Sequence, residues 1–183
     1  PVMDYTVAPL WFHWRRDNWM LERQESEDVV KNWGAGIMGE LSWQFTDWLR
    51  FNTSNRVSFS GRDESQFWSA KTSAGYTPKG YVQWQYEYGI GYITSNTLHF
   101  TKSFDDHNLY GILGQEYSYD QDRWLMGRGH GMVGNMRALS SAGSPNSVGG
   151  NMDETAFMSY FGQVDYNYQS KYFLVGSLRY DAS

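Results

Sequence analysis

The sequence predicts an all-β protein whose strands follow one another as an antiparallel meander. Three observations predict this class. Apolar and polar residues alternate along the chain, most strictly between Met158 and Asp181. Tight turns alternate with long polar or glycine-rich segments, and the apolar face of each predicted hairpin carries no charge. Because successive side chains of a strand point to opposite faces, the pattern indicates a sheet with one apolar and one polar side.

The composition narrows the possible functions. The net charge is -5 and Lys and Arg form no cluster, which argues against a nucleic-acid partner. The absence of cysteine excludes disulfides and thiolate chemistry. No run approaches the roughly eighteen apolar residues of a transmembrane helix, whereas barrel strands, being apolar on one side only, remain possible. Aromatic residues make up 18% of the chain, which suits membrane-interface girdles or sugar-binding surfaces.

The first predicted strand runs from Asp4 to about Trp14, and a long loop follows at about 15–35. The first hairpin then turns at 46–48. Its apolar face holds Ile37, Gly39, Leu41, Trp43 and Phe45, continued by Leu49, Phe51, Thr53, Val57 and Phe59. Its polar face holds Glu40, Gln44, Arg50, Asn52 and Arg56. A second long loop is expected at about 61–90.

The second hairpin is predicted around a turn at 102–106, and its faces are less regular. One face would hold Tyr92, Thr94, Leu98 and Phe100, then Leu109, Gly111, Leu113, Tyr117 and Tyr119. Asn96 and Gln115 also fall on this face, and the opposite face, with Tyr110 and Ile112, is nearly as apolar. The assignment of the two faces therefore stays open. A third long loop is expected at about 120–156.

The last hairpin turns at Gln169–Lys171. Its apolar face holds Met158, Tyr160, Gly162, Val164, Tyr166, Tyr168, Tyr172, Leu174, Gly176, Leu178 and Tyr180. The polar face holds Gln163, Asp165, Asn167, Ser177, Arg179 and Asp181. A Lys or Arg facing lipid would cost about 2–4 kcal/mol, so the uncharged faces fit a membrane barrel, although a sandwich core excludes charge as well.

The lengths of the connections favour the barrel, because outer-membrane barrels alternate tight periplasmic turns with long extracellular loops. All three tight turns are expected at one end of the sheet. Lipid cannot satisfy bare strand edges, so the first and last strands must pair with further chain.

Two segments resemble the barrel of SusC/RagA-type TonB-dependent outer-membrane transporters. The last hairpin, from Ser159 to Asp181, follows the family's pattern S-Y-F-G-R-x-N-Y-x-Y-x-x-K-Y-L-L-x-x-S-x-R-x-D, with Gln163 in place of Arg and Tyr180 also departing from it. Upstream, Asn96-Thr-Leu-His-Phe100 and His107-Asn-Leu-Tyr-Gly-Ile-Leu-Gly-Gln-Glu-Tyr117 are similar to the family's N-T-L-x-Y and H-x-L-x-x-L-x-G-x-E-Y. The resemblance is specific from about Tyr92 to the end and weak before it.

The resemblance implies a central segment, residues 1–183, of a single transmembrane barrel of about 22 strands with long extracellular loops and a plugged lumen. The plug, the TonB-binding N-terminal segment and the remaining strands would lie outside this chain. It further implies import of oligosaccharides, or of peptides, across a bacterial outer membrane, in contact with membrane lipid and driven by TonB through the plug. A SusD-like surface lipoprotein is the implied partner.

Catalysis finds little support in the sequence. The histidines His13, His99, His107 and His130 are scattered, and none has the spacing of a zinc site. His107 is expected to bond turn backbone. The glycine-rich run Gly127–Gly131 is expected in a flexible loop, and the aspartates near it lack a calcium-binding pattern. We therefore predict no enzyme, no cofactor and no metal site.

Aromatic residues of the long loops are the candidates for function, because exposed rings stack on sugars or hold peptide side chains. The candidates for ligand or partner binding are Trp68, Tyr76, Tyr81, Trp84, Tyr86, Trp124 and Arg128. The residues expected to face the lumen are Gln163, Asp165, Asn167 and Arg179. The alternative is that the rings only pack the loops or form a girdle. At the level of the whole protein, the alternatives are a passive porin-like barrel and a soluble carbohydrate-binding sandwich.

Overall fold

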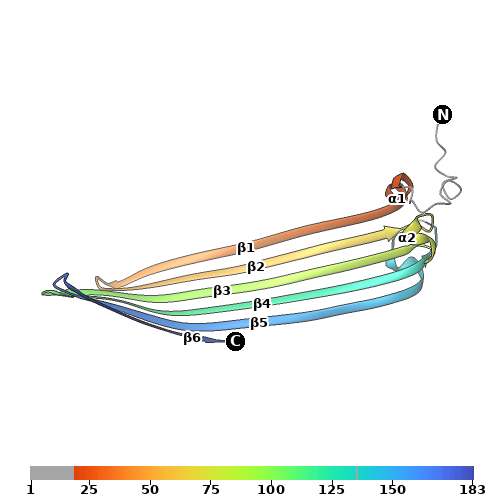
Figure 1. The fold of residues 1–183 in the computed structure, drawn as a ribbon. Coiled ribbons are helices and arrows are strands. Elements are labelled where there is room, and N and C mark those ends of the chain that lie inside the picture. Colours follow the sequence, from red (N-terminus) through yellow and green to blue (C-terminus); the bar gives the residue numbers. More distant parts are fainter. Residues whose placement is uncertain (1–18, 135) are drawn as a thin grey trace. The chain divides into compact units, whose positions relative to one another are not determined.

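A computed structural model describes residues 19–134 and 136–183. Six strands form one antiparallel sheet in the order β1-β2-β3-β4-β5-β6 (Figure 1). The strands are β1 (Ser26–Thr46), β2 (Leu49–Trp68), β3 (Tyr81–Phe104), β4 (His107–Met132), β5 (Ala142–Tyr168) and β6 (Tyr172–Ala182). Two short helices, α1 (Trp19–Glu25) and α2 (Ser73–Tyr76), and the 3-10 turn η2 (Leu139–Ser141) complete the described elements.

The predicted meander is confirmed, and the described residues form no second sheet that a sandwich would require. The strand predicted for Asp4 to Trp14 lies outside the described residues. No described helix has the length and apolar character needed to span a membrane.

The chain divides into two compact units. The turn unit comprises Gly34–Ser60, Gly89–Asp122 and Asp153–Ser183, and it holds the three tight turns. The loop unit comprises, among its described residues, 19–33, 61–88, 123–134 and 136–152, and it holds the helices and the two longer connections. The two units are described separately below.

The three tight turns of the turn unit lie side by side, as predicted. The backbone N–H of Thr101 donates to the carbonyl oxygen of Trp48 at 2.8 Å, which ties the first turn to the second hairpin. The backbone N–H of Gln169 donates to the carbonyl oxygen of Asp106 at 2.8 Å, and its side-chain amide donates to the Asp106 carboxylate at 2.7 Å. These bonds place all three turns at the same end of the unit.

The register of the last hairpin also agrees with the prediction. Tyr168 pairs with Tyr172 across the turn, and Val164 pairs with Gly176. On the other face Gln163 pairs with Ser177. Antiparallel partners share a face, so the apolar and polar sides of the hairpin are those that the alternation predicted.

Contacts in the second hairpin settle the choice of face that the sequence left open. The Phe100 ring lies against Gly111. A Cβ built on Gly111 would be only 2.0 Å from the nearest atom of this ring. The Asn96 amide donates to Gln115 Oε1 at 2.7 Å, which puts these two polar residues on the same face as Phe100. Tyr110 lies on the opposite face, where its hydroxyl is 3.2 Å from His99 Nδ1. Leu113 lies against Gly162 on the apolar face of the last hairpin, since a Cβ built on Gly162 would be 3.1 Å from Leu113 Cδ2. The face with Phe100 and Leu113 therefore continues that apolar face, and the first of the two assignments is correct.

The expected long loops are wrong in extent, because strands occupy most of their length. β2 continues to Trp68 and β3 begins at Tyr81, while β4 continues to Met132 and β5 begins at Ala142. The connections between them are only 69–80 and 133–141. The segment at about 15–35 likewise contains α1 and the first part of β1. The stretches 120–132 and 142–156 show little of the alternation that marks strands in the rest of the chain. Residues 81–88 do alternate, with Val82, Trp84 and Tyr86 on one face and Gln83, Gln85 and Glu87 on the other.

The loop unit has a small core of its own. Val82 is completely buried, with Phe67 and Met132 beside it, and Leu139 of the β4–β5 connection and Ala142 at the start of β5 pack against them. The β2–β3 connection is held by backbone bonds, since Gly131 N–H donates to the carbonyl oxygens of Pro78 and Gly80. Both connections therefore fold back onto the strands that they join.

Candidate ligand-binding site

Three rings gather on one side of the loop unit, where β2 ends, β3 begins and β4 passes beside them. The rings of Trp68 and Tyr81 are stacked, with centroids 4.7 Å apart and 29° between their planes. The His130 ring lies 5.5 Å from Tyr81 on its other side, tilted by 42°. All three residues are half-buried, so part of this aromatic cluster remains open to solvent.

Polar groups fix the orientation of these rings. The buried Gln83 accepts two hydrogen bonds at Oε1, one from the Tyr81 hydroxyl at 2.6 Å and one from Arg128 Nε at 2.5 Å. Burial raises the pKa of the Tyr81 phenol above its ordinary value, and the Arg128 charge opposes that shift. The phenol therefore stays a neutral donor near neutral pH.

His130 makes one further polar contact, because Asn146 Nδ2 lies 2.9 Å from His130 Nε2. The cluster thus combines aromatic faces with a guanidinium, an imidazole and two amides on adjacent strands. Stacking surfaces with a few fixed polar groups are typical of sites that hold sugars or peptide side chains. We use the name Trp68 cluster for Trp68, Tyr81, Gln83, Arg128, His130 and Asn146.

The structure brings together three of the seven predicted ligand-binding candidates, namely Trp68, Tyr81 and Arg128. Trp84 and Tyr86 instead line a cavity of about 270 Å³ on the other side of the same strands, beside Phe67. Strand alternation explains the division, since Trp84 follows Gln83 and Phe67 precedes Trp68.

The other two candidates stand apart from both places. Tyr76 lies on α2 and is 75% exposed. The Trp124 ring lies over Gly149, so that a Cβ built on Gly149 would be 3.2 Å from the ring. In the described part of the chain, no hydrogen bond or ring contact joins either residue to the Trp68 cluster, so the seven candidates do not form one site.

Sequence reasoning missed Gln83, His130 and Asn146 as parts of a site. The glycine-rich run predicts a flexible loop for His130, whereas His130 lies in β4, two residues before this strand ends at Met132. The spacing Gly127, Gly129 and Gly131 was the available signal. Glycine at every second position predicts a strand with one closely covered face and with Arg128 and His130 on the other.

The four predicted lumen residues lie on the polar face of the turn unit. Arg179 donates to Asp181 at 2.8 Å and to Glu116 of β4 at 3.0 Å, and its guanidinium lies 5.6 Å from the Phe161 ring centroid. Gln163 donates to both carboxylate oxygens of Asp165. These contacts connect β4, β5 and β6 through side chains of one face.

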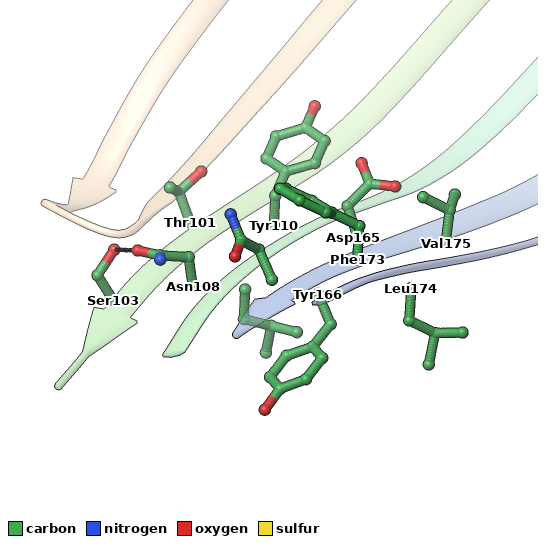
Figure 2. A pocket seen from close by; sticks show the side chains of 11 residues that line it. Thr101, Ser103, Asn108, Tyr110, Asp165, Tyr166, Phe173, Leu174 and Val175 are labelled. Carbon is green, nitrogen blue, oxygen red and sulfur yellow. Dashed lines mark hydrogen bonds between the residues drawn. The ribbon is translucent and has the colours of Figure 1, made fainter. Parts of the chain in front are cut away.

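A second cavity, of about 350 Å³, lies near the turns of the same unit. Figure 2 shows Tyr110, Phe173 and Val175 on one side of the strands, with Tyr166 and Leu174 on the other. The hydroxyl of Ser103 donates to Asn108 Oδ1 at 2.7 Å at its edge (Figure 2). Asp165 and Asn167 also line this cavity.

Among the described residues, no hydrogen bond joins the His107 side chain to turn backbone, contrary to expectation. Its Nδ1 is 2.6 Å from the Tyr166 hydroxyl, and its ring lies 4.8 Å from Tyr168 and 5.3 Å from Phe104. The residue therefore links the second and third hairpins through an aromatic group on the apolar face. Among the described residues, no group of His, Asp and Glu could hold a metal ion.

Comparison with known proteins gives one sequence relative and several structures. No family model matches the chain. The TonB-dependent receptor P3 of Formosa agariphila is 28% identical over 145 residues, which is 78% of this chain and 14% of that protein. The structure of the RagAB peptide transporter matches with a TM-score of 0.78 and 18% identity, over 86% of this chain and 18% of that one. The RagAB peptide importer in its open-open state matches with a TM-score of 0.75 at 18% identity.

The chain therefore spans less than a fifth of the proteins that it matches. The RagAB match covers the six-stranded meander and shows that these strands have the fold of part of that barrel.

Proposed function

We propose that this chain, a homologue of TonB-dependent receptors, forms a section of the barrel wall and the ligand-binding surface of an active importer. TonB-dependent receptors are β-barrels of the bacterial outer membrane, and they are transporters rather than enzymes. The observation that carries the proposal is the RagAB barrel fold over 86% of the chain, combined with the half-buried Trp68 cluster.

The turn unit would cross the membrane. Its apolar face exposes large side chains such as Leu41, Val164 and Leu178, which in water would form an unfavourable patch and in a bilayer would contact lipid. The aromatic group around His107 would lie at the membrane interface, where the rings can contact lipid and their polar atoms can contact water. Gln163, Asp165, Asn167 and Arg179 would face the lumen or the plug.

The loop unit would lie on the extracellular side, where cargo arrives. The Trp68 cluster would stack on the ligand through its rings and orient the ligand through Arg128 and Asn146. The ligand would be an oligosaccharide or a peptide. The RagAB structures described as a peptide transporter support the peptide, and the rings suit either class.

A SusD-like surface lipoprotein would cover the extracellular side, and TonB would drive uptake through a plug outside this chain. The two-component RagAB assembly supports such a partner. Residues 1–183 would then be a segment of one barrel domain.

The test is uptake by the full-length transporter carrying Trp68→Ala or Arg128→Ala. Both changes should reduce uptake of the cognate ligand, because each removes a contact of the Trp68 cluster. The amount of folded barrel in the outer membrane, measured by its heat-dependent gel mobility, should stay at the wild-type level. Trp48→Ala, in a tight turn, is the matched control and should leave uptake unchanged.

Uptake should also cease when TonB is deleted, which separates active import from a passive barrel. Unchanged uptake and unchanged co-purification of the lipoprotein in both cluster variants would show that these rings only pack the strands. Uptake that persists without TonB would overturn the importer itself.

A further inference from the structure

The cavity on the Phe67 side of the loop unit has two halves with similar chemistry. It is lined by residues of β1, β2 and β3 and by Arg137 of the β4–β5 connection. The residues that matter here are Glu27, Asp63, Phe67, Trp84, Tyr86 and Arg137. The cavity lies on the side of β3 opposite to the Trp68 cluster.

One half already holds a cation from the chain itself. The Arg137 guanidinium lies over the Phe67 ring, with Cζ 5.5 Å from the ring centroid, and forms an ion pair with the Glu27 carboxylate. A ring face and a carboxylate attract the same positive charge, and together they hold a guanidinium in a fixed place. In this half of the cavity, a ring face and a carboxylate together hold a side-chain cation.

The other half repeats the arrangement without a cation. Asp63 lies on the same side of β2 as Phe67, and Trp84 and Tyr86 of β3 line the same cavity. In the part of the chain that the structure describes, no ion pair includes Asp63. Tyr86 is 46% exposed, so this half is accessible from solvent.

We propose that the half formed by Asp63, Trp84 and Tyr86 binds the side chain of a Lys or Arg residue from a polypeptide. The lining carries two carboxylates and one guanidinium, Glu27 and Asp63 against Arg137, which leaves one uncompensated negative charge. A cation satisfies both the carboxylate and the ring faces, whereas a neutral sugar would use only the rings and hydrogen bonds. The cation comes from a free peptide or from a partner protein.

The test uses the full-length protein in detergent and two end-blocked pentapeptides, Ala-Ala-Lys-Ala-Ala and Ala-Ala-Gln-Ala-Ala, in calorimetric titrations. The Lys peptide should bind about tenfold or more tightly than the Gln peptide, and added salt should reduce the difference. Asp63→Asn should abolish the preference, and Tyr86→Leu should weaken it.

Glu64→Gln is the matched control, because Glu64 is the next residue of β2 and its carboxylate bonds Arg62 and Gln66. This variant should retain the preference. Equal loss in Glu64→Gln and Asp63→Asn, or competition by a neutral methyl hexoside equal to that of the Lys peptide, would overturn the proposal.

A second arm distinguishes the source of the cation. Asp63→Asn should reduce co-purification of the surface lipoprotein if the Lys or Arg belongs to that partner. No peptide preference in the wild type, together with unchanged co-purification in the variant, would overturn the proposal. Neither measurement depends on uptake. A negative result for cation binding at Asp63 is therefore distinguishable from a negative result for ligand uptake through the Trp68 cluster.

Discussion

At the scale of single residues, adjacent positions of β5 meet opposite environments. Val164 is 43% exposed on the apolar face and pairs with Gly176, while Gln163 bonds Asp165 on the polar face and pairs with Ser177. The family pattern that the last hairpin resembles has Arg at the position of Gln163. One residue step along the strand therefore separates a position that should exclude charge from one that should accept it.

A pair of arginine substitutions tests this difference. Val164→Arg should destabilise the full-length barrel by about 2–4 kcal/mol, because the guanidinium would face lipid near the middle of the bilayer. Gln163→Arg should cost little, since its side chain would face water or the plug. Denaturant titration of each variant refolded into lipid vesicles gives the two free energies of unfolding. Equal stability of the two variants would contradict the assigned faces.

At the scale of elements, β4 carries glycine where another segment covers it. A Cβ at Gly129 would approach the Ala142 Cβ to 2.3 Å, and one at Gly127 would approach a Leu139 methyl group to 2.6 Å. The β4–β5 connection can pack onto β4 because both positions lack a side chain. Gly39 of β1 is different, since no atom lies within 4 Å of its would-be Cβ.

Gly129→Val should therefore displace the β4–β5 connection, at a cost of about 1–3 kcal/mol for overpacking. Limited proteolysis of intact cells should then cleave between 133 and 141 faster than in the wild type. Gly39→Val adds the same side chain in open space and should leave the cleavage rate unchanged. Cleavage of Gly129→Val at the wild-type rate would show that the position of the β4–β5 connection does not depend on the absence of a side chain at residue 129.

The same strand shows what sequence can and cannot predict. Hairpin turns and faces followed from the alternation and from the short turns, because one face of the turn unit is apolar. In β4 this contrast is absent at 127–131, where glycine alternates with Arg128 and His130 and no apolar side chain marks a face. The connection that covers the glycines comes from further along the chain. The position of this connection depends on tertiary packing and cannot be predicted from a local sequence pattern. The same is true of the ring contact between Tyr81 and His130.

At the scale of the whole molecule, each unit has chemistry suited to a different medium. The turn unit exposes a broad apolar face, while the loop unit buries a small core and offers polar and aromatic surfaces. A barrel that imports ligand needs its binding surface outside the cell and its tight turns in the periplasm. The proposed function thus fixes a direction across the membrane for both units.

Cysteine labelling tests that direction, because this chain contains no cysteine of its own. In a cysteine-free background of the full-length protein, Tyr76→Cys should react with a bulky, impermeant maleimide on intact cells, since Tyr76 is 75% exposed on α2 of the loop unit. Ser170→Cys, in the exposed turn between β5 and β6, should react only after the outer membrane is opened. Labelling of Ser170→Cys but not of Tyr76→Cys on intact cells would reverse the orientation, and the Trp68 cluster would then lie on the wrong side to receive cargo.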